Sequence, residues 1–446
     1  MKTAAINPGI RRSVIGTFLL RLVSLAAGLA GSVVLARTLG ADGYGIYAYI
    51  FSIVTVMAIP AQVGMPTLIV RETARARTLE QWSRMKGVWY WAARMILVIS
   101  LFLAIVGLTI GFLWRNQMGD EYFYTLIGGL VLVPIMAIGQ CRDAALRGLR
   151  QIVKGQLADS VIRPLLLAVF VGGLPLVFVV SITPSSAMML HVLSALIAFF
   201  VGFALLYIFK PRELVYAQID YSQSRYWVKS LLPLGMIGAL QIVSSQTDII
   251  MLGILREENE VGIYKVVVSG AALTLFGIQL VNTVISPRLA EYYAKSDLVN
   301  LQKIVTLGSA LTVVITVPAV LVLIFWGDLA LYYIFGSEYA EGYLPLTILV
   351  AAQLVNAFLG PVGMLLNMCG YEKYSVFWLV VATLANVILN LILIPRVGMT
   401  GAALASLVSI LIWNLGFWIT AKIKIGVDGS VLSIFKIYYD RSDKHK

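Results

Sequence analysis

The segment LARTLGADGYGIYA at residues 35–48 aligns without a gap to LGILREENEVGIYK at residues 252–265. At the same spacing, Arg71 is matched by Arg288. Self-similarity at a fixed spacing is the signature of an internal repeat. The sequence therefore predicts a fold of two similar halves. The residues shared by the two segments are Leu35/Leu252, Gly45/Gly262, Ile46/Ile263 and Tyr47/Tyr264.

The composition around these segments is far more apolar than that of a soluble domain. Of the 446 residues, 60% are hydrophobic and 13% are charged, whereas an average soluble domain has roughly 45 to 50% and 25%. These values exclude an ordinary water-soluble enzyme and a disordered or fibrous chain. The 2 cysteines and 2 histidines are too few for a disulfide framework or a metal cluster. We therefore expect an integral membrane protein without cofactor or metal.

The apolar residues are grouped in stretches long enough to cross a bilayer. A helix needs about 20 apolar residues to span roughly 30 Å of hydrocarbon, and no connecting loop between the stretches exceeds about twenty residues. We expect an all-α protein of about twelve transmembrane helices, in which any function resides among the helices. The twelve stretches are approximately 13–36, 44–66, 88–114, 122–140, 155–180, 185–209, 231–255, 262–286, 304–326, 343–366, 374–395 and 398–421.

The distribution of basic residues predicts the orientation. With the N-terminus in the cytoplasm, most of the 34 Lys and Arg residues lie in cytoplasmic segments, as the positive-inside rule requires. Both termini are then cytoplasmic. Topology and attraction to anionic lipid account for the net charge of +12, so no nucleic acid is expected as a partner. The cations predicted outside are Arg37, Arg115, Arg256 and Arg396.

The repeat and the orientation together predict the domain organisation. The first and seventh stretches both run outward, so the two halves share one orientation and enclose a central cavity near the bilayer midplane. We expect two pseudo-symmetric six-helix lobes. The predicted segments are an N-lobe at 1–209, a cytoplasmic linker at 210–230, a C-lobe at 231–421 and a basic cytoplasmic tail at 422–446.

Four segments carry a resemblance to a known family. They are VVLARTLGADGYGIYAYIFSI (33–53), GMPTLIVRETARA (64–76), TDIIMLGILREENEVGIYKVVVS (247–269) and NLILIPRVGMTGAALASLVSI (390–410). The chain resembles the polysaccharide and O-antigen flippases of the multidrug/oligosaccharidyl-lipid/polysaccharide (MOP) exporter superfamily. It departs from them where Arg256 and Glu257 replace an expected Leu-Gly, and in having twelve predicted spans where many relatives have fourteen.

The resemblance implies a function and a location. The implied activity is movement of an undecaprenyl-diphosphate-linked oligosaccharide to the outer leaflet of a bacterial inner membrane, by alternating access and without covalent chemistry. The implied partners are this lipid-linked cargo, the membrane lipids and, as candidates, a polysaccharide polymerase and a chain-length regulator.

Three arginines are the candidate substrate-binding residues. Arg21, Arg94 and Arg163 lie within predicted spans, where an ionised residue costs roughly 2.5 to 3.5 kcal/mol and normally faces protein or water. At about 1.5 Å per residue, each lies roughly 9 to 12 Å inside the cytoplasmic edge of the N-lobe. Guanidinium groups bind phosphate oxygens in forked, charge-assisted pairs. We expect them to capture the lipid diphosphate.

Two intramembrane carboxylates are candidates for coupling or interlobe pairing. Asp159 and Arg163 are spaced i,i+4 and so share a helix face, either as a self-neutralising pair or with Asp159 orienting Arg163 toward the cavity. Asp248 lies deep in the C-lobe, where it either pairs with a Lys or Arg of the opposite lobe or binds a proton or sodium ion. His191 is expected to pack and hydrogen-bond rather than to carry protons.

Other functions remain open. A cation-coupled multidrug exporter of the same superfamily would require more carboxylates in the N-lobe than Asp159 alone. A polysaccharide polymerase or ligase would be expected to carry a large extracytoplasmic loop, and the longest predicted outer loop is about 327–342. A scaffold that only organises glycosyltransferases is the fourth alternative.

Overall fold

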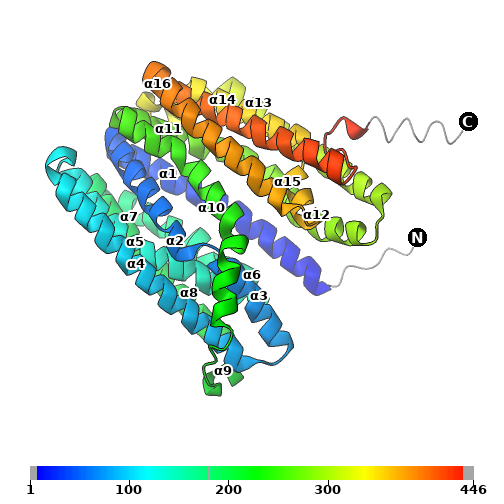
Figure 1. The fold of residues 1–446 in the computed structure, drawn as a ribbon. Coiled ribbons are helices and arrows are strands. Elements are labelled where there is room, and N and C mark those ends of the chain that lie inside the picture. The colour runs from blue at the N-terminus through cyan, green and yellow to red at the C-terminus, as the bar shows by residue number, and fades with distance from the viewer. Residues whose placement is uncertain (1–7, 179–180, 435–446) are drawn as a thin grey trace, which may run out of the picture. The chain divides into compact units, whose positions relative to one another are not determined.

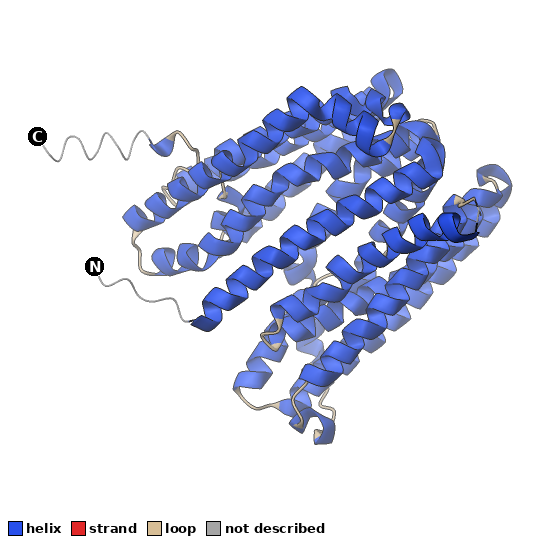
Figure 2. Ribbon diagram, turned by 180° about the vertical axis from the view of Figure 1, so that it is seen from behind, coloured by secondary structure: helices blue, strands red, loops and turns tan. Residues whose placement is uncertain are grey.

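A computed structural model describes residues 8–178 and 181–434, and every regular element in these ranges is helical (Figures 1 and 2). The predicted all-α class is confirmed. In unbroken chain order the elements are α1 (Pro8–Met57), α2 (Ile59–Gln62), α3 (Met65–Thr78), α4 (Trp82–Met118), α5 (Asp120–Gly148), α6 (Ile152–Leu157), the π-helix η1 (Ala158–Ile162), α7 (Arg163–Phe178), α8 (Pro184–Phe209), α9 (Glu213–Tyr216), α10 (Ser224–Leu255), α11 (Glu258–Ala271), η2 (Ala272–Leu275), α12 (Phe276–Ala294), α13 (Leu298–Ala330), η3 (Leu331–Phe335), η4 (Ser337–Gly342), α14 (Tyr343–Leu359), α15 (Val362–Met368) and α16 (Glu372–Lys424).

Within the described residues, 10 helices are long and apolar enough to cross a membrane. Two of them, Gly16–Met57 and Glu372–Lys424, are far longer than a single crossing needs. Each is interrupted by backbone that is not helical, at Gly40 in α1 and at Val397 and Gly398 in α16. Our sequence boundaries place two stretches in each of these helices. The total of twelve crossings stays a prediction.

Glycine permits both interruptions. Gly40 has a φ of 66° and Gly398 a φ of 57°, in the left-handed region that side chains with a Cβ rarely adopt. Pro395, three residues before Gly398, further weakens the helix because its nitrogen cannot donate a hydrogen bond. The chain therefore reverses direction at Gly40 in α1 and at Gly398 in α16, so that the two parts of each helix lie side by side.

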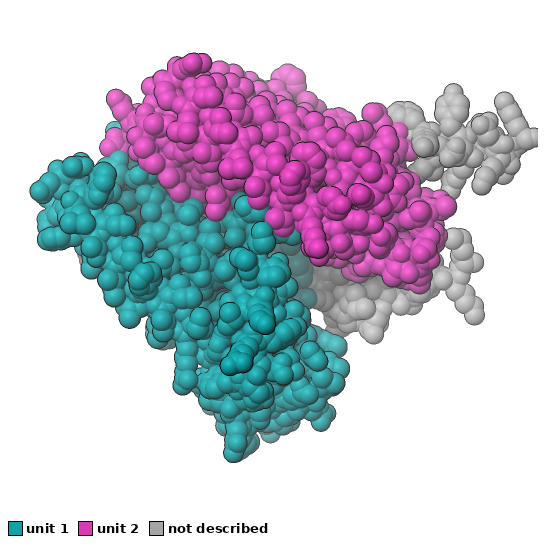
Figure 3. All heavy atoms as spheres, in the orientation of Figure 1, with its two compact units in different colours: residues 1–242 teal, residues 243–446 magenta. Residues whose placement is uncertain are grey.

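The chain divides into two compact units, Met1–Ile242 (unit 1) and Val243–Lys446 (unit 2), coloured separately in Figure 3. The division falls inside α10, beyond the predicted linker at 210–230. The first part of α10 is fixed to unit 1, because Trp227 is fully buried with its ring 5.4 Å from that of Trp91. Further along α10, a Cβ on Gly235 would collide with the backbone of Gly64.

Small residues allow the helices of unit 1 to pack closely. Gly107 and Gly111 of α4 lie against leucine side chains of α5, and Gly129 of α5 lies against Val54 of α1. Such contacts are typical of helix association in membranes, where close approach replaces a hydrophobic driving force. The opposite face of α4 exposes large apolar side chains, such as Val98 at 66% and Phe102 at 64%. This face suits contact with lipid.

Candidate functional site

A buried polar cluster in unit 1 contains the first tyrosine of the repeat. The Tyr47 hydroxyl is hydrogen-bonded to Nδ1 of His191 on α8 at 2.6 Å, and both residues are buried. Phe51, one turn after Tyr47, places its ring 5.1 Å from the imidazole. His191 therefore packs and hydrogen-bonds, as expected. We call Tyr47, His191 and the adjacent Arg163 the unit 1 cluster.

Arg163 is the charged member of this cluster. It begins α7, directly after the π-helix η1, and α7 packs against both α1, which carries Tyr47, and α8, which carries His191. Its side chain is partly exposed. Among the described residues, no hydrogen bond or ion pair engages its guanidinium group. An intramembrane cation normally faces protein or water.

Asp159 does not pair with Arg163, so the predicted i,i+4 pair is wrong. Its Oδ2 accepts a hydrogen bond from Nη2 of Arg142 on α5 at 2.5 Å. The physical reason is η1, because i→i+5 bonding changes the angular spacing of side chains that an α-helix would align. Gly202 of α8 gives the Arg142 guanidinium its space, since a Cβ there would overlap it.

The three predicted arginines do not converge on one point. Gly31 of α1 lies against the carbonyl of Pro164, so Arg21, ten residues earlier on α1, is about 15 Å from the level of Arg163 along the helix. Arg21 is partly buried. Arg94 lies on the exposed side of α4, with its guanidinium carbon 5.7 Å from the centre of the Tyr221 ring. Their role in substrate binding stays a prediction.

A second buried cluster, the unit 2 cluster, surrounds Asp248 on α10. Asp248 is 6% exposed, and four neutral groups donate hydrogen bonds to its carboxylate. Tyr264 of α11 donates to Oδ2 at 2.8 Å, and Ser406 donates to the same oxygen at 2.5 Å. Asn386 and Asn390 of α16 donate to Oδ1 at 3.0 and 2.8 Å. All the described partners of Asp248 therefore lie in unit 2 and are uncharged. The partner of Asp159, Arg142, lies with it in unit 1.

The unit 2 cluster contains one buried oxygen without a partner. Oδ1 of Asn390 accepts no hydrogen bond in the described structure, although its amide nitrogen is used twice. Carboxylate, amide and hydroxyl oxygens are the donors that hard cations prefer. The chain as described contains no group of three or more His, Cys, Asp or Glu residues arranged to hold a metal.

Arg256, one of the two residues that depart from the expected Leu-Gly pattern, and Glu260 stabilise the break in α16. Arg256 donates to the carbonyls of Ile394 and Pro395 at 3.0 and 3.1 Å, where the first half of α16 ends. Glu260 accepts from the backbone N–H of Met399 at 2.8 Å, where the second half begins. Charged side chains thus satisfy the polar groups exposed at both helix ends.

Sequence reasoning missed most partners in these clusters. The sequence pattern gave no sign that Arg142 pairs with Asp159, yet Arg142 is 3% exposed and ion-paired. Asn386 and Asn390 were not predicted as partners of Asp248, because they lie far from it in the sequence. The signal that would have identified them is their i,i+4 spacing in an otherwise apolar helix.

Comparisons with known proteins identify the family. A family model described as Polysaccharide biosynthesis protein matches residues 10–293, more than half of the chain, and the MatE model matches residues 233–392. A probable low-salt glycan biosynthesis flippase, Agl15 of Haloferax volcanii, is 22% identical over 406 residues, covering 90% of this chain and 81% of that protein.

Solved structures show the same fold. An inward-facing multidrug resistance MATE transporter of the MOP superfamily has a TM-score of 0.72 at 15% identity, covering 92% of this chain and 98% of that one. The lipid II flippase MurJ, in an inward closed conformation, has a TM-score of 0.71 at 15% identity, covering 92% of this chain and 87% of that one. This chain therefore belongs to the polysaccharide biosynthesis protein family, among the multi-pass flippases and transporters of the MOP superfamily.

Proposed function

We propose that this transporter moves a lipid-linked oligosaccharide, carried on a polyprenyl diphosphate, from the inner to the outer leaflet by alternating access. Two comparisons support the proposal. The family model that covers more than half of the chain is one of polysaccharide biosynthesis, and the relative Agl15 is described as a glycan biosynthesis flippase. In this proposal the translocated oligosaccharide is used to build a surface polysaccharide such as O-antigen. The protein itself makes or breaks no covalent bond.

Arg163 is the observation that carries the proposal. It is an intramembrane guanidinium group without a described partner, beside two buried polar rings that hold its surroundings in place. A diphosphate offers oxygens in the geometry that guanidinium binds bidentately, and the pair stays ionised at any physiological pH. In our proposal Arg163 binds the diphosphate, and Arg21 and Arg94 attract it at other depths.

We assign energy coupling to the unit 2 cluster. A buried carboxylate with only neutral neighbours can accept a proton or a small cation, and the binding would alter the balance between conformations. Rotation of the Asn390 amide would turn its unused oxygen toward Asp248. Only a cation between the two oxygens would stabilise that arrangement.

We also propose the orientation. Both termini face the cytoplasm, in the inner or plasma membrane, because that orientation places most of the 34 cations inside. On this topology the diphosphate enters from the side on which nucleotide sugars are used. A polymerase and a chain-length regulator would act downstream, on the translocated product.

The test is leaflet-resolved transport by the purified protein alone. Proteoliposomes would contain a fluorescent polyprenyl-diphosphate disaccharide, and a membrane-impermeant enzyme or quencher would report how much reaches the other leaflet. We expect transport by the wild type and strong impairment in Arg163→Ala, with Arg163→Lys intermediate. Equal rates in empty liposomes and protein-containing liposomes would refute the flippase assignment. Proton and sodium gradients would be imposed separately to test coupling through Asp248.

The multidrug exporter is the second candidate, favoured by the MatE match over residues 233–392. A transporter of organic cations should bind them through an acidic site. The same proteoliposomes would therefore receive ethidium as a fluorescent cation. Gradient-driven ethidium transport that depends on Asp248 and is insensitive to Arg163→Ala would reverse our ranking.

A further inference from the structure

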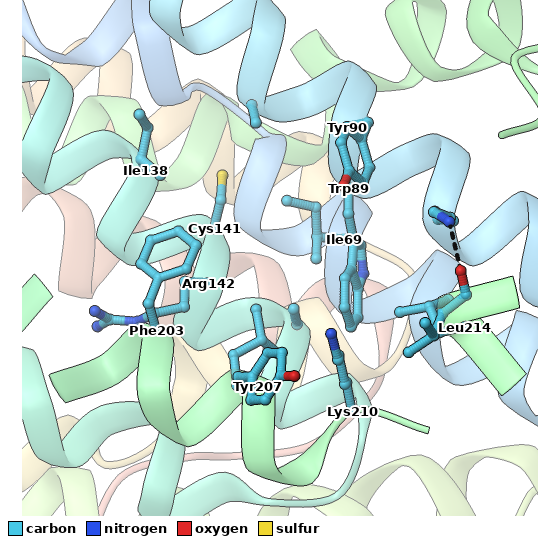
Figure 4. A pocket seen from close by; sticks show the side chains of 15 residues that line it. Ile69, Trp89, Tyr90, Ile138, Cys141, Arg142, Phe203, Tyr207, Lys210 and Leu214 are labelled. Atoms are coloured by element: carbon cyan, nitrogen blue, oxygen red, sulfur yellow. Dashed lines mark hydrogen bonds between the residues drawn. The ribbon is translucent and has the colours of Figure 1, made fainter. Parts of the chain in front are cut away.

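Unit 1 contains a cavity of about 550 Å³ that the proposed transport site does not use. Helices α3, α4, α5, α8 and α9 supply its walls (Figure 4). Its buried side is formed by apolar or small residues such as Ile69, Ala145 and Leu214. Exposed aromatic residues, among them Tyr90 and Tyr207, lie on its open side. The volume falls within the range of about 300 to 1,000 Å³ that is usual for ligand pockets.

The charged groups lining this cavity are all basic. They are Lys86, Arg142 and Lys210, and the described lining contains no Asp or Glu. The Arg142 guanidinium is ion-paired with Asp159 and neutralised by it. Neither lysine forms an ion pair with any residue that the structure describes. The cavity therefore presents two uncompensated positive charges beside an apolar interior.

The positions of the two ammonium groups are defined by local contacts. Lys86 Nζ donates to the carbonyls of Val215 and Ala217 at 3.1 and 2.8 Å, which leaves its third hydrogen for another acceptor. Lys210 Nζ lies 4.0 Å from the centre of the Tyr207 ring. Figure 4 shows the Lys210 side chain directed between Tyr207 and Leu214 toward the interior of the cavity.

The sequence-predicted topology places the opening at the cytoplasmic surface. Lys86 belongs to the first predicted cytoplasmic loop and Lys210 to the predicted cytoplasmic linker. Aromatic residues with a polar end, such as Trp89, Tyr90 and Tyr207, are typical of the boundary between hydrocarbon and headgroups. Basic pockets between transmembrane helices on this side are suited to anionic lipid headgroups.

We propose that this cavity is a binding site for an anionic bilayer phospholipid of the cytoplasmic leaflet. One acyl chain occupies the apolar interior, and the headgroup phosphate contacts Lys86 and Lys210. A soluble anion would leave the apolar walls uncovered, and a lipid without net charge would leave the charge of the two lysines uncompensated. All the walls belong to unit 1, so the lipid stays with that unit and joins α9 and the start of the linker to α4 and α8. The proposal does not depend on the transported cargo.

Lipid retention by the purified protein tests the proposal. Wild-type protein would be equilibrated with phosphatidylglycerol or phosphatidylcholine of identical chains, and retained lipid would be counted by native mass spectrometry. With two lysines near the phosphate, we expect phosphatidylglycerol to be preferred by about 10- to 30-fold. In Lys86→Gln/Lys210→Gln the preference should fall nearly to parity. Lys210→Gln alone, which breaks no hydrogen bond described for the ammonium group, should lower it severalfold.

Matched variants separate this site from general charge and from misfolding. Lys303→Gln/Lys373→Gln removes two exposed lysines of unit 2 and should leave the preference unchanged. Ala93→Phe, from an exposed position on the cavity wall, should fill the cavity and remove the retained lipid without disturbing a buried contact. Equal retention of the two lipids by wild type, or an unchanged preference in both lysine variants, would overturn the proposal. Preferential retention of undecaprenyl phosphate over phosphatidylglycerol would also overturn it and assign the cavity to the transport path.

Discussion

In unit 1, Tyr47 is hydrogen-bonded to His191, and Arg163 of the same cluster has no hydrogen-bond or ion-pair partner among the described residues. In unit 2, the equivalent Tyr264 donates to Asp248, an anion held by four neutral donors. The repeat thus places a tyrosine at the same point of both units and builds around it clusters of opposite charge. Among the described residues, Arg163 of the unit 1 cluster has no hydrogen-bond or ion-pair partner, whereas Asp248 of the unit 2 cluster has four donors.

From this difference we expect different roles for the two clusters. An unpaired guanidinium can bind an anionic ligand without first breaking a protein contact. A carboxylate with four donors is structurally important, and it can change state only when a proton or cation replaces some of those donors. We therefore expect substitutions in unit 1 to affect transport first and substitutions in unit 2 to affect stability first.

The largest expected effect is on the stability of unit 2. Asp248→Ala removes the shared acceptor of four buried donors, and each unsatisfied buried group costs about 1 to 3 kcal/mol. We expect the free energy of unfolding to fall by about 3 kcal/mol or more, measured by thermal or denaturant unfolding in detergent micelles. Asp42→Ala, at an exposed position of unit 1, is the control and should unfold like the wild type. An unchanged unfolding midpoint for Asp248→Ala would show that the network does not hold unit 2 together.

The next effect concerns transport by unit 1. Arg163→Ala should reduce the rate of lipid-linked sugar translocation by about 10- to 100-fold, because a hydrogen bond to a charged group contributes about 1.5 to 3 kcal/mol. Its unfolding midpoint should barely change, since no described contact is lost. Arg75→Ala, at an exposed position of α3 outside the proposed site, is the matched control and should retain most activity. Wild-type transport by Arg163→Ala at equal protein abundance would remove the proposed anion site.

The two tyrosines offer a direct comparison at equivalent positions. Tyr264→Phe removes a donor to a charged carboxylate and should cost about 2 kcal/mol of stability. Tyr47→Phe removes a hydrogen bond with a neutral imidazole and should cost about 1 kcal/mol. Unfolding of the two variants under the same conditions measures the difference. A larger loss for Tyr47→Phe would contradict the assignment of the stabilising role to the unit 2 cluster.

The smallest expected effect is at the helix ends. In unit 2, Glu260 accepts from Met399 N–H, and in unit 1, Glu121 accepts from Ser185 N–H, both at 2.8 Å. Replacing either by Ala should cost about 1 kcal/mol, as for other lost helix caps. Amide hydrogen exchange should quicken only at the start of the affected helix. Faster exchange throughout the unit would mean that the glutamate stabilises the whole unit and not only the helix end that it caps.

Several features were predictable because they depend on local physical chemistry. The apolar stretches required membrane helices, and the helical class is confirmed. The repeat identified Tyr47 and Tyr264 as equivalent, and the structure shows both in buried polar clusters. Gly40 lies between two predicted stretches and Gly398 begins the predicted stretch 398–421; glycine tolerates the positive φ found at both positions.

The partners of the charged residues depended on tertiary structure. The i,i+4 spacing assigned Asp159 to Arg163, but η1 changes the alignment and Arg142 takes the carboxylate from another helix. Helical periodicity describes neighbours on one helix only. It could not show that the donors to Asp248 come from α11 and from both halves of α16, since those contacts join residues far apart in the chain. By itself, the sequence determined which segments enter the membrane and which residues carry charge there. Packing between helices decided which charges are paired inside each unit, such as Asp159 with Arg142.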